Sequence, residues 1–410
     1  MTDVSTLRRI LNDGAATVQS LRPGLIEREH LGILIERAKF EVIEVITGVR
    51  RSGKSTILCE VGNSLTKTGK DVQYINFEDE RFIPSVEDFQ NILSLMETDK
   101  AVLLLDEPQN MPGWEKWVRR LHDRRIKVYL TGSNSRLLGS ELATALSGRS
   151  RSHEIFPFSF REFLDVKAPG TVPSDRLTQM LGEYIKEGGF PYPTVSGDAI
   201  HADYRRDIVE RDILMRHRIS DIERFRNFVR FVLSNPGAML SNKRMKGFLK
   251  IHHTTLRKYV GYMEDAYLII TLEKYAHSQR VRMQNPKKAY PIDNGLLIDK
   301  ESRGLLLESA VVQHIRRYVP RLYYWKDERG REVDLYLPET NTAIQVVYEV
   351  TSQNIEREEA ALDSAEREFG CTGILVHMFG RAETRHRSIN AVDFLCEDPL
   401  RMFGKPKKRL

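Results

Sequence analysis

The nine residues GVRRSGKST, Gly48–Thr56, follow the apolar run Val42–Ile46. They match the pattern of a glycine-rich loop that ends in a lysine and a hydroxyl residue at the start of a helix. Gly48 and Gly53 allow the backbone to curl so that its N–H groups point inward, and the positive end of the next helix attracts anions. The stretch therefore predicts a phosphate-binding loop between a strand and a helix.

Each residue of this loop has an expected role. Lys54 is expected to reach the β- and γ-phosphates of a nucleotide, and the Ser55 hydroxyl is expected to coordinate Mg²⁺. The other residues that we assign to nucleotide binding are Gly48, Arg50, Arg51, Ser52, Gly53 and Thr56.

A second stretch, Ala101–Glu107, places two acids directly after an apolar run. Such a pair is costly to hold there unless a cation or substrate lies beside it. We expect Asp106 to serve the Mg²⁺ ion and Glu107 to orient an attacking water. A protein that only bound the nucleotide would not need that second carboxylate, so the pair predicts hydrolysis of ATP with Mg²⁺.

Apolar runs alternate with helical patterns around these two stretches. Strands are expected at Val42–Thr47, Val72–Phe77, Ala101–Leu105 and Val128–Leu130. Helices are expected at Ser55–Thr68, Val86–Met96 and Trp114–Arg125. This order is typical of an α/β fold with a parallel sheet, in which ligands gather at the carboxyl ends of the strands.

Three further residues are candidates for catalysis. Ser133 and Asn134 follow the fourth strand, where either could hold the attacking water, although both residue types also favour helix N-caps. Arg149 follows the next helical segment. An arginine there could enter a neighbouring subunit's nucleotide site and stabilise charge on the transferred phosphoryl group. It could equally be a surface arginine near a helix C-terminus.

Composition indicates a soluble, cytoplasmic protein. The chain has 410 residues, enough for two or three domains. No apolar run approaches the roughly twenty residues that span a bilayer, so no membrane partner is expected. The N-terminus lacks the apolar core of a secretory signal. Cys59, Cys371 and Cys396 are widely separated, which favours reduced packing residues.

Positive charge is concentrated in one segment. Ser241–Lys288 contains eleven lysines or arginines against three acids, although the net charge of the whole chain is only +6. A helix-turn-helix with helices at Asn242–Lys250 and Thr254–Tyr267, followed by wing strands at Leu268–Tyr275 and Lys288–Ile292, fits this segment. The candidate DNA contacts are Thr255, Arg257, Lys258, Arg280, Arg282, Lys287 and Lys288.

These contacts are mostly of the phosphate kind, so no sequence specificity is expected. A winged helix used for protein contacts, or as part of a lid, is the alternative.

Several segments together resemble a known family: GVRRSGKST, LLLDEPQN, TGSNSRLL, LSGR with FPFSFREFL, and GGFPYP. They resemble the prokaryotic AAA-type ATPases, common in archaea, that couple a P-loop module to a C-terminal nuclease-like domain. The resemblance implies an AAA+ core, a helical lid whose Gly189 and Pro191 face the nucleotide, and assembly into a homo-oligomer, such as a hexameric ring. From its residues alone, GGFP is a turn between helices.

The last hundred residues resemble the restriction-endonuclease-like fold. Helices are expected at Leu305–Tyr318 and Glu356–Phe369. Strands are expected at Leu322–Trp325, Glu332–Leu337, Ala343–Val350 and, as the final strand, Gly373–His377.

In this resemblance Gly330–Asp334 matches the segment with the metal-binding aspartate. The implied vestigial site is Glu308, Asp334 and Gln345. Active members place Glu-x-Lys where this chain has Gln345-Val-Val347. Glu349 shares a strand face with Gln345, so a migrated carboxylate stays open. We expect a degenerate nuclease fold that binds DNA ends or junctions, with a purely scaffolding domain as the alternative.

The predicted domains are a helical lead-in at 1–35, an AAA+ core at 36–165, a helical lid at 166–235, a winged helix at 236–296 and a nuclease-like α/β domain at 297–410. The predicted function is Mg²⁺-dependent ATP hydrolysis that remodels or translocates along branched or duplex DNA, in repair or defence. Two alternatives are a signalling-type nucleotide switch that binds a protein partner and an ATP-gated, metal-dependent nuclease.

Overall fold

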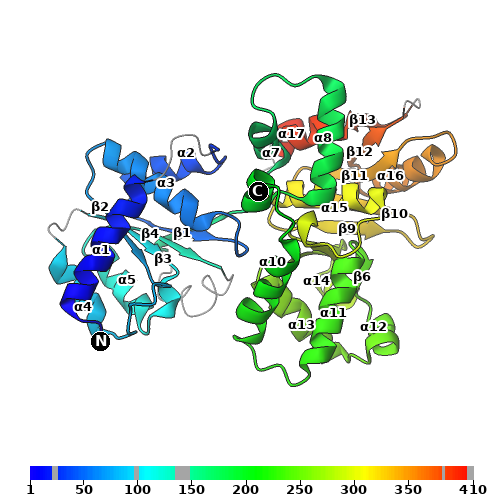
Figure 1. The fold of residues 1–410 in the computed structure, drawn as a ribbon. Helices are drawn as coiled ribbons and strands as arrows, with labels where there is room; N and C mark the ends of the chain where they lie inside the picture. Colours follow the sequence, from blue (N-terminus) through cyan, green and yellow to red (C-terminus); the bar gives the residue numbers. More distant parts are fainter. Residues whose placement is uncertain (21–25, 97–100, 134–147, 381–383, 404–410) are drawn as a thin grey trace. The chain divides into compact units, whose positions relative to one another are not determined.

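The described part of the chain forms two units in the computed structural model (Figure 1). Residues 1–20, 26–96, 101–133, 148–380 and 384–403 are described. The first unit comprises Met1–Phe156 with Asp265–Tyr267, and the second comprises Pro157–Glu264 and Leu268–Leu410. None of the described helices is long and apolar enough to cross a membrane.

A five-stranded parallel sheet forms the centre of the first unit, with strand order β2-β3-β4-β1-β5. The strands are β1 (Ile43–Thr47), β2 (Val72–Asn76), β3 (Val102–Asp106), β4 (Lys127–Gly132) and β5 (Ser150–Glu154). The α/β fold class is confirmed, and the four predicted strands lie within two residues of their expected bounds at either end.

Helices cover both faces of this sheet because both faces are apolar. They are α1 (Val4–Gln19), α2 (Leu31–Glu36), α3 (Lys54–Lys67), α4 (Glu87–Leu95) and α5 (Trp114–Asp123), with short 3₁₀ turns at Arg37–Lys39 and Pro108–Asn110. Helices α4 and α5 share a buried cluster with Val45 and Leu105, whereas α2 and α3 share one with Ile46 and Leu104. Each fully buried aliphatic side chain stabilises the fold by roughly 1.5–3 kcal/mol.

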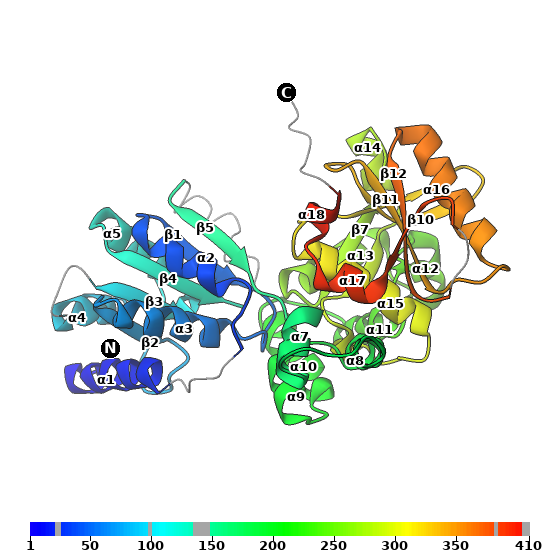
Figure 2. The same cartoon turned by 90° about the horizontal axis from the view of Figure 1, so that it is seen from above.

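Helix α1 lies beside the edge strand β2 in both views (Figures 1 and 2). The approach is close at Gly14, where an added Cβ would lie 2.1 Å from the Tyr74 carbonyl oxygen. Thr2 ties the start of this helix to α4, since its backbone N–H donates to Asp88 at 2.9 Å. Helices α1 and α2, which lie mostly within the lead-in expected at 1–35, therefore pack on the sheet of the first unit.

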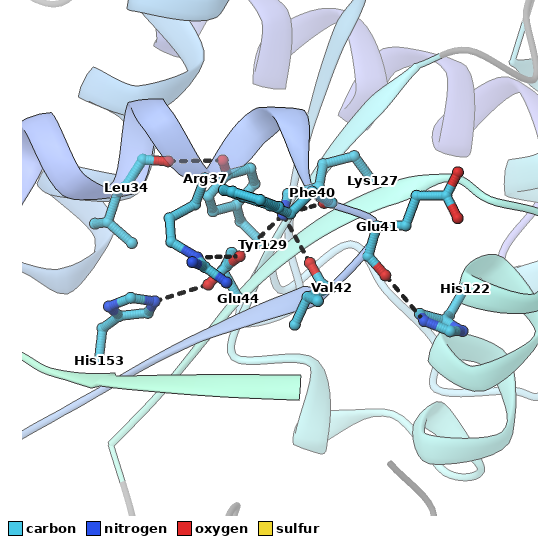
Figure 3. Close-up of polar contacts among 10 residues, drawn as sticks. All are labelled: Leu34, Arg37, Phe40, Glu41, Val42, Glu44, His122, Lys127, Tyr129 and His153. Atoms are coloured by element: carbon cyan, nitrogen blue, oxygen red, sulfur yellow. Dashed lines mark hydrogen bonds and ion pairs between the residues drawn. The ribbon is translucent and has the colours of Figure 1, made fainter. Parts of the chain in front are cut away.

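A buried ion cluster lies within the sheet, around Glu44 of β1 (Figure 3). Arg37 and Lys127 each donate to the Glu44 carboxylate at 3.0 Å. His153 Nε2 of β5 lies 2.7 Å from its other oxygen. The cluster thus links β1 to β4, to β5 and to the turn that follows α2.

These partners set the charge of Glu44, whose side chain is fully buried. Burial raises the pKa of Glu44, but its contacts with His153, Lys127 and Arg37 outweigh this effect and lower the pKa to about 2. Glu44 is therefore ionised at neutral pH inside the sheet.

The second unit begins with a helical region. It contains α7 (Phe160–Lys167), α8 (Ser174–Glu187), α9 (Pro191–Ser196), α10 (His201–Asp207), a π-helix (Ile208–Leu214) and α11 (Ile222–Ser234). Ser159 and Glu162 form a capping box at the start of α7. The helical character expected for residues 166–235 is therefore present.

The next segment contains the two predicted helices, α12 (Asn242–Leu249) and α13 (His253–Asp265). The predicted strands follow as β7 (Ile269–Lys274) and β8 (Lys288–Pro291), which pair antiparallel, and β8 also pairs with β6 (Ala238–Met239). A helix that sequence reasoning missed, α14 (Gln279–Gln284), lies between β7 and β8. Strand β7 also pairs parallel with a strand of the C-terminal region, so one sheet crosses the expected boundary at residue 296.

That sheet has eight strands, in the order β13-β12-β11-β10-β9-β7-β8-β6. Its C-terminal strands are β9 (Tyr323–Lys326), β10 (Glu332–Leu337), β11 (Thr342–Glu349), β12 (Thr372–Phe379) and β13 (Arg387–Asn390). The helices are α15 (Arg303–Arg316), α16 (Ile355–Phe369), α17 (Ala391–Cys396) and α18 (Pro399–Phe403), with a 3₁₀ turn at Asn294–Leu296. The expectation that the strand at Gly373–His377 is the last was wrong, because β13 extends the sheet beyond it.

We predict that Glu44→Gln destabilises the first unit by about 3–5 kcal/mol near neutral pH, because it leaves buried cations without their carboxylate. The free energy of unfolding in urea, followed by the fluorescence of the buried Trp114 and Trp117, measures this loss. Glu41→Gln is the matched control, because Glu41 lies 3.7 Å from Arg125 in an exposed pair. Its loss should cost less than about 1 kcal/mol.

The pH dependence of this difference has a definite sign. A carboxylate whose pKa falls on folding stabilises the protein above its ordinary pKa, and this contribution is lost as the pH falls through the folded-state value. The difference between wild type and Glu44→Gln should therefore shrink between the ordinary pKa of 4.5 and about pH 2. A constant difference across this window would contradict the assignment.

Candidate functional site

The glycine-rich loop joins β1 to α3, as expected. Gly48 has φ 140°, and a Cβ there would lie 2.1 Å from the carbonyl oxygen of Ile155. Gly53 has φ 95° and forms the N-cap of α3. Both glycines are therefore needed for the backbone conformation, which leaves the first N–H groups of α3 available to an anion.

Lys54 and two hydroxyls start helix α3. Lys54 is 5% exposed, and its Nζ donates to the Val49 carbonyl oxygen at 3.0 Å. The side chains of Ser55 and Thr56 are exposed on the first turn of the helix. The lysine is thus held over the loop, while the hydroxyls are accessible to a metal ion or a phosphate.

The two loop arginines differ in their surroundings. Arg50 Nη1 lies 3.7 Å from Glu78 Oε1. Arg51 is exposed and has φ 70°, an unusual value for a residue with a side chain. The loop therefore carries backbone strain at Arg51.

Arg28 braces this loop, a role that sequence reasoning missed. Its side chain is 7% exposed, and its guanidinium donates to the carbonyl oxygens of Ser52 at 3.0 Å and Phe156 at 2.7 Å. Ser52 itself is fully buried. No local pattern marks Arg28, because its partners are backbone atoms that are distant in sequence.

Asp106 lies at the end of β3 and is held from both neighbouring strands. Tyr74 of β2 donates its hydroxyl to Asp106 Oδ2 at 2.8 Å. Thr131 of β4 donates its hydroxyl to Oδ1. Asp106 is 3% exposed, so this carboxylate is fixed in one position at the carboxyl edge of the sheet.

Glu107 turns away from the strand at a left-handed residue, with φ 52°. Its backbone N–H donates to the Thr131 hydroxyl oxygen at 3.0 Å, and Gln109 donates to its carboxylate. Burial raises the pKa of Glu107, nearby Lys54 opposes this, and Asp106 reinforces it. A carboxylate with a raised pKa is a better proton acceptor near neutral pH.

The two candidate γ-phosphate sensors are only partly described. Ser133 follows β4 directly and is 1% exposed. Asn134 lies outside the described residues. The sensing role of both residues stays a prediction.

Arg149 lies at the other edge of the sheet. Its carbonyl oxygen accepts from the N–H of Ile43, the first residue of β1, at 2.9 Å. The phosphate-binding loop follows the last residue of the same strand. Arg149 is thus at the opposite end of β1 from its own loop, and its guanidinium lies 3.9 Å from Asp123, so its role in a neighbouring subunit stays a prediction.

The GGFP turn belongs to the second unit and is tightly packed there. Gly189 donates its N–H to Asp293 Oδ2 at 2.8 Å and accepts from the Phe158 N–H at 2.6 Å. A Cβ at Gly189 would lie 2.2 Å from the Phe158 carbonyl oxygen. Pro191 starts helix α9. Packing therefore accounts for the glycine, and a contact of Gly189 or Pro191 with a nucleotide stays a prediction.

Lys288 departs from its predicted role as a DNA contact. Its side chain is 5% exposed, and its Nζ lies 2.6 Å from Glu332, 3.5 Å from Glu308 and 3.9 Å from Asp334. Burial lowers the pKa of Lys288, but the carboxylates raise it above its ordinary value. An ammonium group enclosed in this way cannot reach a phosphate on the surface.

Two of the three residues of the predicted vestigial nuclease site thus surround Lys288. Burial, followed by the charge of Glu308, raises the pKa of Asp334 well above its ordinary value. Gln345, the third residue, donates its Nε2 to Glu358 at 2.8 Å. Asp334, Gln345 and Glu358 line one cavity of about 350 Å³.

The other predicted DNA contacts fall into two groups. Arg257 and Lys258 are exposed on α13, and Arg280 is exposed on α14. By contrast, Lys287 is paired with Glu264 at 3.1 Å, and Arg282 lies over the Tyr323 ring, 5.7 Å from its centroid. Thr255 is half-buried.

Comparison with known proteins shows an AAA domain at residues 41–164. Two domains of unknown function, DUF8612 and DUF4143, match residues 178–302 and 303–395. An uncharacterized protein of Methanocaldococcus jannaschii is 35% identical, with 79% of this chain and 78% of that protein covered. A protein of Haemophilus influenzae is 31% identical, over 66% and 72%.

The structure also resembles two solved structures. AMPPCP-bound DnaA from Aquifex aeolicus matches with a TM-score of 0.33 and 16% identity, over 60% of this chain and 90% of that chain. Cdc6p from Pyrobaculum aerophilum matches with a TM-score of 0.28 and 16% identity, over 70% and 93%. Similarity at this level says nothing about function.

We predict that Thr131→Val weakens Mg²⁺-dependent ATP binding by about 10–100-fold, because Asp106 loses one of its two hydroxyl donors. Titration of the protein with ATP, with and without Mg²⁺, measures this change in affinity. Thr66→Val is the matched control, since the Thr66 hydroxyl donates only to the Gly62 carbonyl oxygen of its own helix, at 2.9 Å. An equal loss of affinity without Mg²⁺ would contradict the role of Thr131 in holding Asp106.

Proposed function

The chain belongs to the family of AAA-domain proteins that includes the Methanocaldococcus jannaschii relative, and we propose that it hydrolyses ATP with Mg²⁺ and acts on DNA. One observation carries the hydrolysis: the Thr131 hydroxyl contacts both Asp106 and the Glu107 backbone at the carboxyl edge of the sheet. A single side chain therefore positions the metal-binding and the water-orienting residue together.

The residues around the loop fit Mg-ATP. The first N–H groups of α3 and the Lys54 ammonium bind the β- and γ-phosphates. The exposed Ser55 hydroxyl and the fixed Asp106 carboxylate hold Mg²⁺, which supplies positive charge to the phosphates when bound. Arg28 keeps the loop in place through the Ser52 carbonyl oxygen.

Glu107 orients the attacking water. Its raised pKa suits a group that accepts a proton during attack, while the nearby Lys54 favours the ionised form. Ser133 and Asn134 hold the γ-phosphate side of the site. The roles of Glu107 and Ser133 follow from their positions after β3 and β4, which are neighbours in the sheet, whereas the role of Asn134, which lies outside the described residues, follows from the sequence alone.

A complete site requires a second copy of the chain. Arg149 is at the wrong end of β1 to reach its own loop, so it supplies its charge to the site of a neighbouring subunit. We therefore propose a closed homo-oligomer, such as a hexameric ring.

Helices α12 and α13 with strands β7 and β8 form a winged helix that binds DNA. The exposed Arg257, Lys258 and Arg280 are its phosphate contacts. Lys287 and Arg282 act less directly, since each already has an acidic or aromatic partner. The proposed substrate is branched or duplex DNA, which the protein remodels with the free energy of ATP hydrolysis.

A second candidate function is metal-dependent DNA cleavage, and one observation favours it. Lys288 enters from β8 and places an ammonium among Glu308, Glu332 and Asp334. The sequence has no lysine at residue 347, where active members of the resembling fold carry one, but the structure brings a lysine to the carboxylates from another strand. This function is distinct from the ATPase activity and is tested separately.

We predict that DNA raises steady-state ATP hydrolysis several-fold in the wild type. Glu107→Gln should lose at least about 100-fold of the activity while it still binds ATP, because it removes only the water-orienting charge. Phosphate release would be measured with no nucleic acid, linear duplex, single strand and four-way junction in turn. Turnover unchanged by every DNA would exclude the DNA proposal and favour a switch that binds a protein partner.

Strand scission of supercoiled plasmid with Mg²⁺ or Mn²⁺ tests the second candidate. If the cluster is catalytic, scission should be lost in Asp334→Asn and in Lys288→Met, while Glu368→Gln, which changes an exposed carboxylate of α16, keeps it. ATP hydrolysis in the absence of DNA should be unaffected by all three substitutions. No scission by the wild type with either metal would rule this candidate out.

A further inference from the structure

A cleft lies between α13 and α14 in the second unit. Its inner hollow has a volume of about 480 Å³ and its outer hollow about 670 Å³. Four residues line both hollows, Asn242, His253, Arg257 and Gln284, so the two are continuous. The cleft exists because α14 stands between β7 and β8, where a simple wing would carry a loop.

The outer hollow is positively charged. Arg257 of α13 and Arg280 of α14 both line it, and both are exposed. Within the described residues neither arginine has an ion pair with a carboxylate. Guanidinium groups without acidic partners are suited to a phosphate, which they bind through paired N–H donors.

The inner hollow has a different character. Leu256 and Val260 of α13 form an apolar wall, and the amide side chains of Gln284 and Asn285 offer donors and acceptors. Glu264 also lines it, with its charge balanced by Lys287 at 3.1 Å. The carboxylate of Glu264 disfavours a phosphate in the inner hollow. A nucleobase fits better, because its flat apolar face can lie on Leu256 and Val260 while its polar edges meet the amides.

Size excludes a base-paired duplex from the cleft interior. Hollows of about 300–1,000 Å³ hold single small molecules. In a duplex the bases are stacked and paired, so only an unstacked nucleotide can insert its base while its phosphate stays outside.

We propose that this cleft binds one unpaired nucleotide of a DNA strand, with the phosphate on Arg257 and Arg280 and the base against Leu256 and Val260. The inference rests on the proposed action on DNA and narrows its substrate. DNA with unpaired nucleotides, either single-stranded or at a branch, is recognised in preference to blunt duplex.

Fluorescence anisotropy of the full-length chain without ATP tests this. A labelled single strand should bind at least about fivefold more tightly than a blunt duplex of the same length. The double variant Arg257→Ala/Arg280→Ala should weaken single-strand binding more than about tenfold, because it removes both phosphate ligands. Gln284→Trp should weaken it as well, because Gln284 is exposed and a larger side chain there fills the cleft.

Lys246→Ala is the matched control. Lys246 is an exposed cation of α12 that lines neither hollow, so its loss should change the affinity less than about twofold. Equal affinity for single strand and duplex would overturn the proposal. If Lys246→Ala lost half as much binding free energy as the double variant, or more, this would also overturn the proposal, since binding would then follow the number of charges removed.

Two further outcomes separate this inference from the proposed function. Competition by an equal concentration of a free nucleoside monophosphate would identify a small-molecule site and overturn the assignment to a strand. If DNA stimulates ATP hydrolysis equally in the wild type and in Gln284→Trp, and both bind single strand equally, the cleft proposal fails while the ATPase proposal stands. If single strand binds as expected but no DNA stimulates hydrolysis, the cleft proposal stands and the proposal that DNA stimulates ATP hydrolysis fails.

Discussion

All strands of a parallel sheet end at the same edge, and the chemistry proposed for the first unit depends on this constraint. Strands β2, β3 and β4 are adjacent, so Tyr74, Asp106 and Thr131 lie in hydrogen-bonding contact although they are distant in sequence. The same constraint separates Arg149 from its own phosphate-binding loop. If Arg149 acts in catalysis, as proposed, it acts on another molecule, and the proposed activity would then depend on assembly.

The sheet also contains a buried charged residue, Glu44, in the largely apolar strand β1. Glu44 is tolerated in β1 because Arg37, Lys127 and His153 come from three other elements to surround it. Removing one partner of such a cluster lowers the stability of the fold by more than forming the whole cluster raises it, because each cation would be left buried without its carboxylate. The cluster therefore fixes how β1 aligns with β4 and β5, and β1 is the strand that leads into the phosphate-binding loop.

Local patterns predicted much of this architecture. The loop, its strand and the acidic pair follow from residue types at fixed spacing, and helices are present at both segments where the helix-turn-helix was expected. The residues that could not be predicted act over long sequence separations. Arg28 binds backbone carbonyl oxygens, which no residue type reveals, and Thr131 was recognised only as part of a loop. Helix α14 was missed because its six residues are too few for a periodic pattern.

Lys288 shows most clearly that contacts between residues distant in sequence could not be predicted. Lys287 and Lys288 are both lysines, and the sequence alone predicts that both belong to one DNA-binding surface. Lys287 directly precedes β8 and pairs with Glu264 beside the cleft, whereas Lys288, the first residue of β8, lies among the carboxylates of the C-terminal region. Lys288 of β8 and Glu332 of β10 belong to one continuous sheet, whereas Glu264, the partner of Lys287, lies on α13. A displacement of β8 would thus alter both ion pairs at once.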